Sequence, residues 1–209
     1  MTAVKARPYH HGDLRAALLE AVAEVVREGG LGQVSLREVA RRVPVTHAAA
    51  AHHFGNKAGL LTAFATQGYS LLGASIMDSV LAAHATDGPG MLEAVGRGYV
   101  RFALANRERF EAMFRLDLAD PADPAYIAAS EAAYSMLTST VQRCVREGFI
   151  ALEEAEPVAV SSWSLVHGLA VLWMSGRLSE RIVETDPERL AARASKLFVD
   201  AVLRQGRAR

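Results

Sequence analysis

The side chains best suited to bind another molecule are concentrated between residues 35 and 57. Hydroxyl, imidazole, guanidinium and ammonium groups can donate to phosphate oxygens, and alanine methyls can contact thymine methyls where a helix lies deep in a groove. We therefore predict DNA contacts here, although local packing would equally explain a histidine such as His53. The predicted contact residues are Ser35, Arg37, Thr46, His47, Ala48, Ala49, His52, His53 and Lys57, with Tyr9 in a basic arm that a frayed terminus would also explain.

Short helices are expected to position these side chains. Ser35 and Glu38 have the spacing of a capping box, in which the hydroxyl accepts from the Glu38 amide and the carboxylate reaches back. Pro44 ends that helix, Thr46 is expected to cap the next one, and Asn56 a long third one. Two short helices joined in this way are typical of a helix-turn-helix, whose second helix enters the major groove of DNA.

The same stretch resembles the TetR family of bacterial repressors. The matching residues are Val34-Ser35-Leu36-Arg37-Glu38-Val39-Ala40, Val45-Thr46 and His52-His53-Phe54-Gly55-Asn56-Lys57-Ala58-Gly59-Leu60-Leu61. Tyr9-His10-His11-Gly12-Asp13-Leu14-Arg15 and Trp163-Ser164-Leu165-Val166-His167-Gly168 resemble a TetR subgroup with a Trp-x-x-x-His-Gly effector domain. The resemblance implies a ligand-responsive repressor that binds a palindromic operator in double-stranded DNA and is released by a small apolar or aromatic effector.

Two positions depart from the family pattern. Pro44 stands where the family has a glycine, and because proline cannot adopt a positive φ, the turn must have a different shape. Ala51 or His52 replaces the usual tyrosine of the recognition helix, depending on the alignment. These departures keep open an alternative, namely a helical ligand-binding or scaffold protein whose head has lost DNA binding.

Composition predicts an all-α protein. About half of the 209 residues are apolar, alanine is abundant, and clusters of strand-forming residues are scarce. Residues 1–57 carry eight Lys or Arg against five Asp or Glu in a chain of zero net charge, which suits a DNA-binding head but also an ordinary solvated surface. We predict about nine helices: a three-helix head in residues 1–57, starting with a helix capped by Asp13, and a helical bundle for ligand binding and dimerisation in residues 58–209.

The body contains an aromatic and methionine-rich set that would suit either an apolar ligand cavity or an ordinary core. The resemblance favours the cavity, with His167 as the polar contact and the long helix from Asn56 as the link to the head. The predicted ligand-binding residues are Tyr69, Tyr99, Phe102, Met113, Phe114, Tyr134, Trp163 and His167. No cofactor is expected.

Two further helices are expected to form a homodimer interface. The stretch from Val158 to Met174 is apolar nearly all the way round and must be covered on every side, by a second subunit or by its own bundle. The helix after Pro187 has an apolar stripe that could complete a four-helix contact. The predicted interface residues are Leu165, Leu169, Leu172, Leu190, Leu197, Phe198 and Val202.

Other classes of protein receive little support from the sequence. Ser164 and His167 could share a helix face, but no nucleophile elbow or orienting carboxylate accompanies them, and Cys144 lacks a clear activating partner, so no catalytic residue is predicted. Adjacent histidines point their rings apart, so no metal site is predicted. The Val158–Met174 stretch is short for a membrane span of about 20 residues, and a cytoplasmic protein without a membrane partner is expected.

Overall fold

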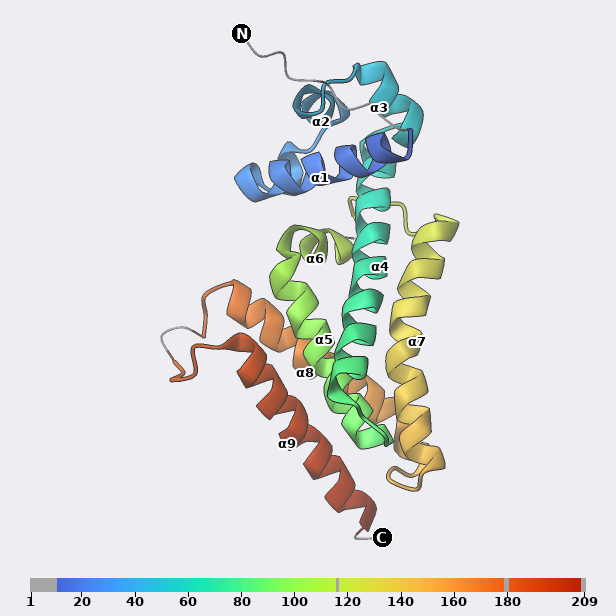
Figure 1. Ribbon diagram of the computed structural model, residues 1–209, viewed down its shortest axis with the longest axis vertical. Coiled ribbons are helices and arrows are strands. Elements are labelled where there is room, and N and C mark those ends of the chain that lie inside the picture. Colours follow the sequence, from blue (N-terminus) through green and yellow to red (C-terminus); the bar gives the residue numbers. More distant parts are fainter. Residues whose placement is uncertain (1–10, 116, 179–180, 208–209) are drawn as a thin grey trace.

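The computed structural model describes residues 11–115, 117–178 and 181–207 of the chain. Over these residues it contains nine α-helices, two short 3-10 helices and no strand, which confirms the predicted all-α class. The head lies at one end of the molecule and the C-terminal helix reaches the other, with α4 running between them (Figure 1).

The head is formed by three helices around one small core. They are α1 (His11–Gly29), α2 (Leu36–Arg42) and α3 (His47–Phe54), with the 3-10 turn η1 (Leu31–Gln33) after α1. Leu18, Val22 and Val39 are fully buried where these helices meet. α1 begins at His11, so Asp13 lies inside its first turn rather than at the cap, and Gly30 ends it with a φ of 78°.

Helix starts in the head follow the predicted caps. The Ser35 hydroxyl accepts from the Glu38 amide at 3.1 Å, and Thr46 and Asn56 cap α3 and α4 in the same way. The other half of the predicted capping box is wrong, because the Glu38 carboxylate accepts from Arg41 and Arg42 instead. These two hydrogen-bonded guanidinium groups lower the pKa of Glu38 to about 2.

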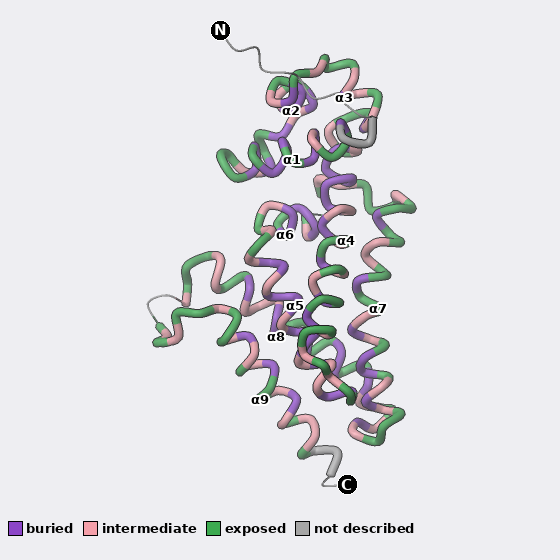
Figure 2. The backbone as a smooth tube through the Cα atoms, viewed as in Figure 1, coloured by how far each residue is buried: buried purple, intermediate pink, exposed green. Residues whose placement is uncertain are grey.

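The body is a bundle of six helices around α4 and α5. Its helices are α4 (Lys57–Ala83), α5 (Gly88–Ala105), α6 (Arg107–Met113), α7 (Pro124–Arg146), α8 (Ala155–Met174) and α9 (Pro187–Arg207), with the 3-10 turn η2 (Leu152–Glu154) before α8. Buried positions recur along α4 and α5 at the centre of the body (Figure 2). At Gly98 of α5 the two backbones come so close that an added Cβ would lie 2.6 Å from the Ile76 Cα. A side chain at Gly98 would therefore force α4 and α5 apart.

One apolar helix is largely uncovered by the rest of the chain. The segment Leu152–Met174 is 23 residues long, so it is longer than the sequence indicated and, by length and composition alone, could cross a membrane. Only 22% of its most apolar window is buried. Val160, Val171 and Leu172 of α8 are exposed on its surface, as is Leu197 of α9. The described chain thus leaves an apolar surface on these two helices.

Candidate functional site

Helix α3 presents a thin, exposed surface at the end of the molecule. Thr46, His47, Ala48 and His52 are exposed, while Ala50 and Phe54 on the opposite side are buried and fix α3 to the head. Because the exposed residue after His47 is the small Ala48 and the next three residues are also alanines, the helix backbone can approach another surface closely. This is the geometry that a helix needs to enter a DNA groove.

The turn between α2 and α3 is shaped by proline. The amide of Val45 donates to the Val43 carbonyl at 2.6 Å, which closes a three-residue turn around Pro44. This turn needs no positive φ, so Pro44 is compatible with two correctly capped helices. The two helices therefore form on either side of Pro44.

The other residues predicted to contact DNA occupy different settings. Arg37 is exposed, and the Lys57 ammonium donates to the Gly32 carbonyl at 2.9 Å, which ties the start of α4 to the η1 turn. Ser35 is half-buried at its cap, and His53 packs its ring beside Phe54 with centroids 6.1 Å apart. Ala49 is half-buried against the core. Tyr9 lies outside the described residues.

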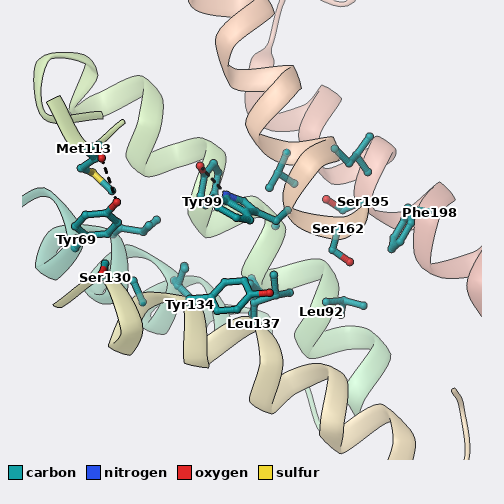
Figure 3. Close-up of a pocket in the computed structure, with 18 of the residues that line it drawn as sticks. Tyr69, Leu92, Tyr99, Met113, Ser130, Tyr134, Leu137, Ser162, Ser195 and Phe198 are labelled. Carbon is teal, nitrogen blue, oxygen red and sulfur yellow. Dashed lines mark hydrogen bonds between the residues drawn. The ribbon is translucent and has the colours of Figure 1, made fainter. Parts of the chain in front are cut away.

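The body contains an open cavity of about 450 Å³. Its walls come from α4, α5, α7, α8 and α9, with the end of α6 closing one side, and Figure 3 shows side chains from these helices pointing into it. Six of the eight predicted ligand-binding residues line it, namely Tyr69, Tyr99, Met113, Phe114, Tyr134 and Trp163. A volume of this size lies within the range of small-molecule sites in proteins.

The remaining two predicted ligand-binding residues do not line the cavity. Phe102 is 1% exposed and packs in the core. His167 lies behind Tyr99, whose hydroxyl is 2.9 Å from its Nδ1 and also accepts from Trp163 Nε1 at 3.3 Å. Burial lowers the pKa of His167 and raises that of Tyr99, so a neutral imidazole that accepts from the Tyr99 hydroxyl fits this arrangement. His167 therefore positions the tyrosine instead of facing the cavity.

Several cavity residues were not predicted as ligand contacts. Leu165 and Phe198 line the cavity, although the sequence placed them only in a dimer interface. Ser162, Ser195 and Glu131 also line it, and no local sequence signal identified them. Among the other predicted interface residues, Leu172 and Leu197 are exposed, whereas Leu169 and Val202 pack partly against the core of the chain and Leu190 is half-buried.

Helix α6 connects the cavity to the head, in addition to α4. Met113 and Phe114 at its C-terminal end line the cavity, and the Met113 carbonyl accepts from the Tyr69 hydroxyl at 3.2 Å. Toward its N-terminal end, the buried Arg109 is hydrogen-bonded to Glu20 of α1 and to Gln67 of α4. The expectation that α4 alone links body and head is therefore wrong.

The groups considered for catalysis have no reactive geometry. Cys144 is buried, and burial raises the pKa of its thiol to about 11, which keeps it protonated. Ser164 lies on the exposed face of α8, whereas Nδ1 of His167 is occupied by Tyr99. Within the described residues, no three His, Cys, Asp or Glu side chains are grouped to hold a metal ion.

Comparisons with known proteins match both halves of the chain. Residues 18–64 match the model described as bacterial regulatory proteins, tetR family, and residues 92–198 match the tetracyclin repressor-like C-terminal domain. No curated protein sequence matches. A solved protein of unknown function from Rhodococcus sp. RHA1 is 30% identical, with a TM-score of 0.79 over 94% of this chain and 98% of that chain.

Two further solved structures share the fold at lower identity. The TetR-family transcriptional regulator PfmR from Thermus thermophilus is 19% identical, with a TM-score of 0.66 over 90% of this chain and 97% of that chain. The regulator FadR from Bacillus subtilis, solved with stearoyl-CoA, is 13% identical, with a TM-score of 0.69 over 88% of this chain and 97% of that chain.

Proposed function

This chain belongs to the TetR family of DNA-binding transcriptional regulators, and we propose that it is a homodimeric, cytoplasmic repressor released from a palindromic operator by a small apolar effector. The observation that carries this proposal is the connection between the cavity and the head. One short helix, α6, lines the cavity with Met113 and holds the head through Arg109. A molecule that fills the cavity acts on the helix that positions the DNA-binding surface.

The dimer is supported by the uncovered apolar surface of α8 and α9. Large exposed apolar patches mark sites of association, and Leu172 and Leu197 are about half and two-thirds exposed in the single chain. A twofold axis through this surface pairs identical patches from two subunits. The two α3 helices would then read half-sites about 34 Å apart, or a multiple of that spacing, which is why we propose a palindromic operator.

A ligand can control the dimer only if it favours one arrangement of the two heads over the other. A tenfold change in operator affinity needs about 1.4 kcal/mol of differential binding, and a near-complete switch needs about 5.5 kcal/mol. The experiment that tests the proposal adds lipophilic fractions of a bacterial extract to the protein bound to a labelled operator, selected beforehand from random DNA. Release by at least one fraction, read as a fall in fluorescence anisotropy, is expected. If no fraction releases the operator, effector release is wrong.

Lys57→Ala is expected to weaken binding to all DNA sequences and to reduce the salt dependence of binding by about one unit of slope. Lys57 stands at the N-terminus of α4, beside the exposed surface of α3, where its charge can meet a DNA phosphate. Binding constants measured at several salt concentrations give the slope. The control is Arg146→Ala, which removes an exposed cation at the opposite end of the molecule and should leave the slope unchanged. An unchanged slope in Lys57→Ala would remove this residue from the phosphate contacts.

Arg109→Met is expected to preserve effector binding but to reduce operator release from tenfold or more to less than about threefold. The substitution removes the hydrogen bonds to Glu20 and Gln67 and keeps much of the side-chain bulk. Glu20 is mostly exposed, so the substitution leaves no buried carboxylate without a partner. Effector affinity and operator affinity, each measured with and without the other ligand, give the coupling.

Arg115→Met is the matched control, because the ion pair of Arg115 is local, with Asp117 two residues away. Full release in Arg109→Met would show that the coupling does not pass through this contact. The alternative of a scaffold protein makes a different prediction from the start, since such a protein would select no operator at all. The assignment to the Trp-x-x-x-His-Gly subgroup stays a prediction.

A further inference from the structure

The cavity contains one polar atom that the protein leaves without a partner. Ser195 on α9 is 5% exposed and lines the cavity, and its hydroxyl oxygen makes no hydrogen bond within the described part of the chain. A buried hydroxyl without a partner is costly, so its presence calls for a partner that the protein itself does not provide. In Figure 3, Ser195 lies with Ser162 and Phe198 at the end of the cavity opposite Tyr69.

The other buried polar groups of the cavity are already engaged. The Tyr69 hydroxyl donates to the Met113 carbonyl at 3.2 Å, and the Ser162 hydroxyl donates to the Val158 carbonyl at 2.7 Å. The Tyr99 hydroxyl is shared between His167 and Trp163. These groups satisfy each other or the backbone, so Ser195 is the group that a ligand can satisfy.

The charges around the cavity disfavour the burial of an anionic group. No Lys, Arg or His is among the described residues that line it, so a carboxylate or phosphate would be buried without a counter-charge. The one ionisable carboxyl in the lining belongs to Glu131 on α7, which is exposed at the rim beside Tyr134. Its negative charge further disfavours an anion that approaches there.

We infer that the effector is a neutral, largely apolar molecule with one alcohol or carbonyl oxygen, and that this oxygen is hydrogen-bonded to Ser195. The inference rests on the proposed role of the cavity as the effector site and specifies what that site selects. A serine hydroxyl can donate to a carbonyl and can also accept from an alcohol, so both oxygen groups fit. The apolar remainder lies against Leu92, Tyr134 and Phe198.

The test compares four ten-carbon probes that differ only in the oxygen group at or next to one end: 1-decanol, 2-decanone, decanoate and decane, which has none. Each is titrated against the full-length protein, with displacement of the neutral dye Nile red as the readout. The alcohol and the ketone are expected to bind at least tenfold more tightly than decanoate. Comparable or tighter binding of decanoate would overturn the neutral class.

Ser195→Ala is expected to weaken binding of 1-decanol and 2-decanone by roughly fivefold, the effect of one neutral hydrogen bond, and to leave decane unchanged. Its melting temperature should stay the same or rise, since the variant loses an unpartnered hydroxyl. The control Ser164→Ala, on the exposed face of α8, should change neither probe binding nor the melting temperature.

Glu131→Gln removes the negative charge of the lining and should strengthen the binding of decanoate but not of the neutral probes. The control Asp78→Asn, exposed on α4 and outside the cavity lining, should not change the binding of decanoate.

The outcomes separate this inference from the proposed function. If neither the dye nor any probe binds, the cavity is not an effector site and both fail. If the probes bind but Ser195→Ala keeps the preference for the alcohol over decane, the cavity binds ligands and only the assignment of Ser195 fails.

Discussion

Ala48→Phe is expected to reduce operator binding to the level of non-specific DNA, a loss of roughly a thousandfold or more. Ala48 is exposed on α3 between His47 and the buried Ala50, so a phenylalanine there has room in the free protein. Against DNA, however, the ring would hold the helix away from the base edges and remove the contacts of Thr46 and His47 together. Anisotropy titrations with the selected operator and with unrelated DNA measure both affinities.

The matched control for this variant is Ala82→Phe, which places the same ring on an exposed alanine at the far end of α4. Both variants should keep the melting temperature, the dimer and probe binding in the cavity. Near-normal operator affinity in Ala48→Phe would mean that α3 does not lie deep in the groove, and the sequence-specific contacts would have to come from another part of the head.

Leu197→Glu is expected to dissociate the dimer, with a dissociation constant raised by at least a hundredfold. Leu197 is 65% exposed in the single chain and lies on α9, one of the two helices of the proposed interface. A buried, unpaired carboxylate costs about 3–5 kcal/mol, and a twofold axis repeats the change in the second subunit. Sedimentation velocity over a range of protein concentrations measures the dissociation constant.

Leu81→Glu is the matched control, because Leu81 has nearly the same exposure, 64%, but lies on α4. Phe198 is unsuitable for this test because it also lines the cavity. If Leu197→Glu remains a dimer as stable as the control, the subunits associate through another surface. Operator affinity should fall together with dimerisation, since a monomer can occupy only one half-site.

The parts of the fold that depend on local chemistry could be predicted from the sequence. Helix starts at Thr46 and Asn56 depend on a side chain that accepts from an amide three residues later, so both sides of the interaction are visible in a short stretch. The prediction of a capping box was wrong in part, and the reason is also local. Two guanidinium groups compete for the Glu38 carboxylate, and one of them, Arg42, is fixed by Glu28 of α1.

The cavity could be predicted only in outline, because it depends on which helix faces meet. Large aromatic side chains such as Tyr99 and Trp163 indicate an apolar interior wherever they lie. A small residue such as Ser195 carries no such signal, because its position depends on a distant residue. Its hydroxyl oxygen fits against α5 only because Gly96 has no side chain, since a Cβ added there would lie 2.5 Å from that oxygen. Likewise, an apolar stripe on α9 does not reveal whether Phe198 faces a second subunit or a cavity.

The backbone contact between Gly98 and Ile76 provides a point about which α4 can pivot. Because no side chain separates the two helices there, the contact cannot compress and acts as a fulcrum near Ile76. With the usual helical rise, Tyr69 at the cavity lies about 10 Å from this point along α4 and Lys57 at the head lies about 28 Å from it. If α4 tilts as a rigid rod about this point, Lys57 at the head moves nearly three times as far as Tyr69 at the cavity. A small movement of the cavity wall by a ligand would thus misalign the exposed surface of α3 with the DNA, and no helix would need to unfold.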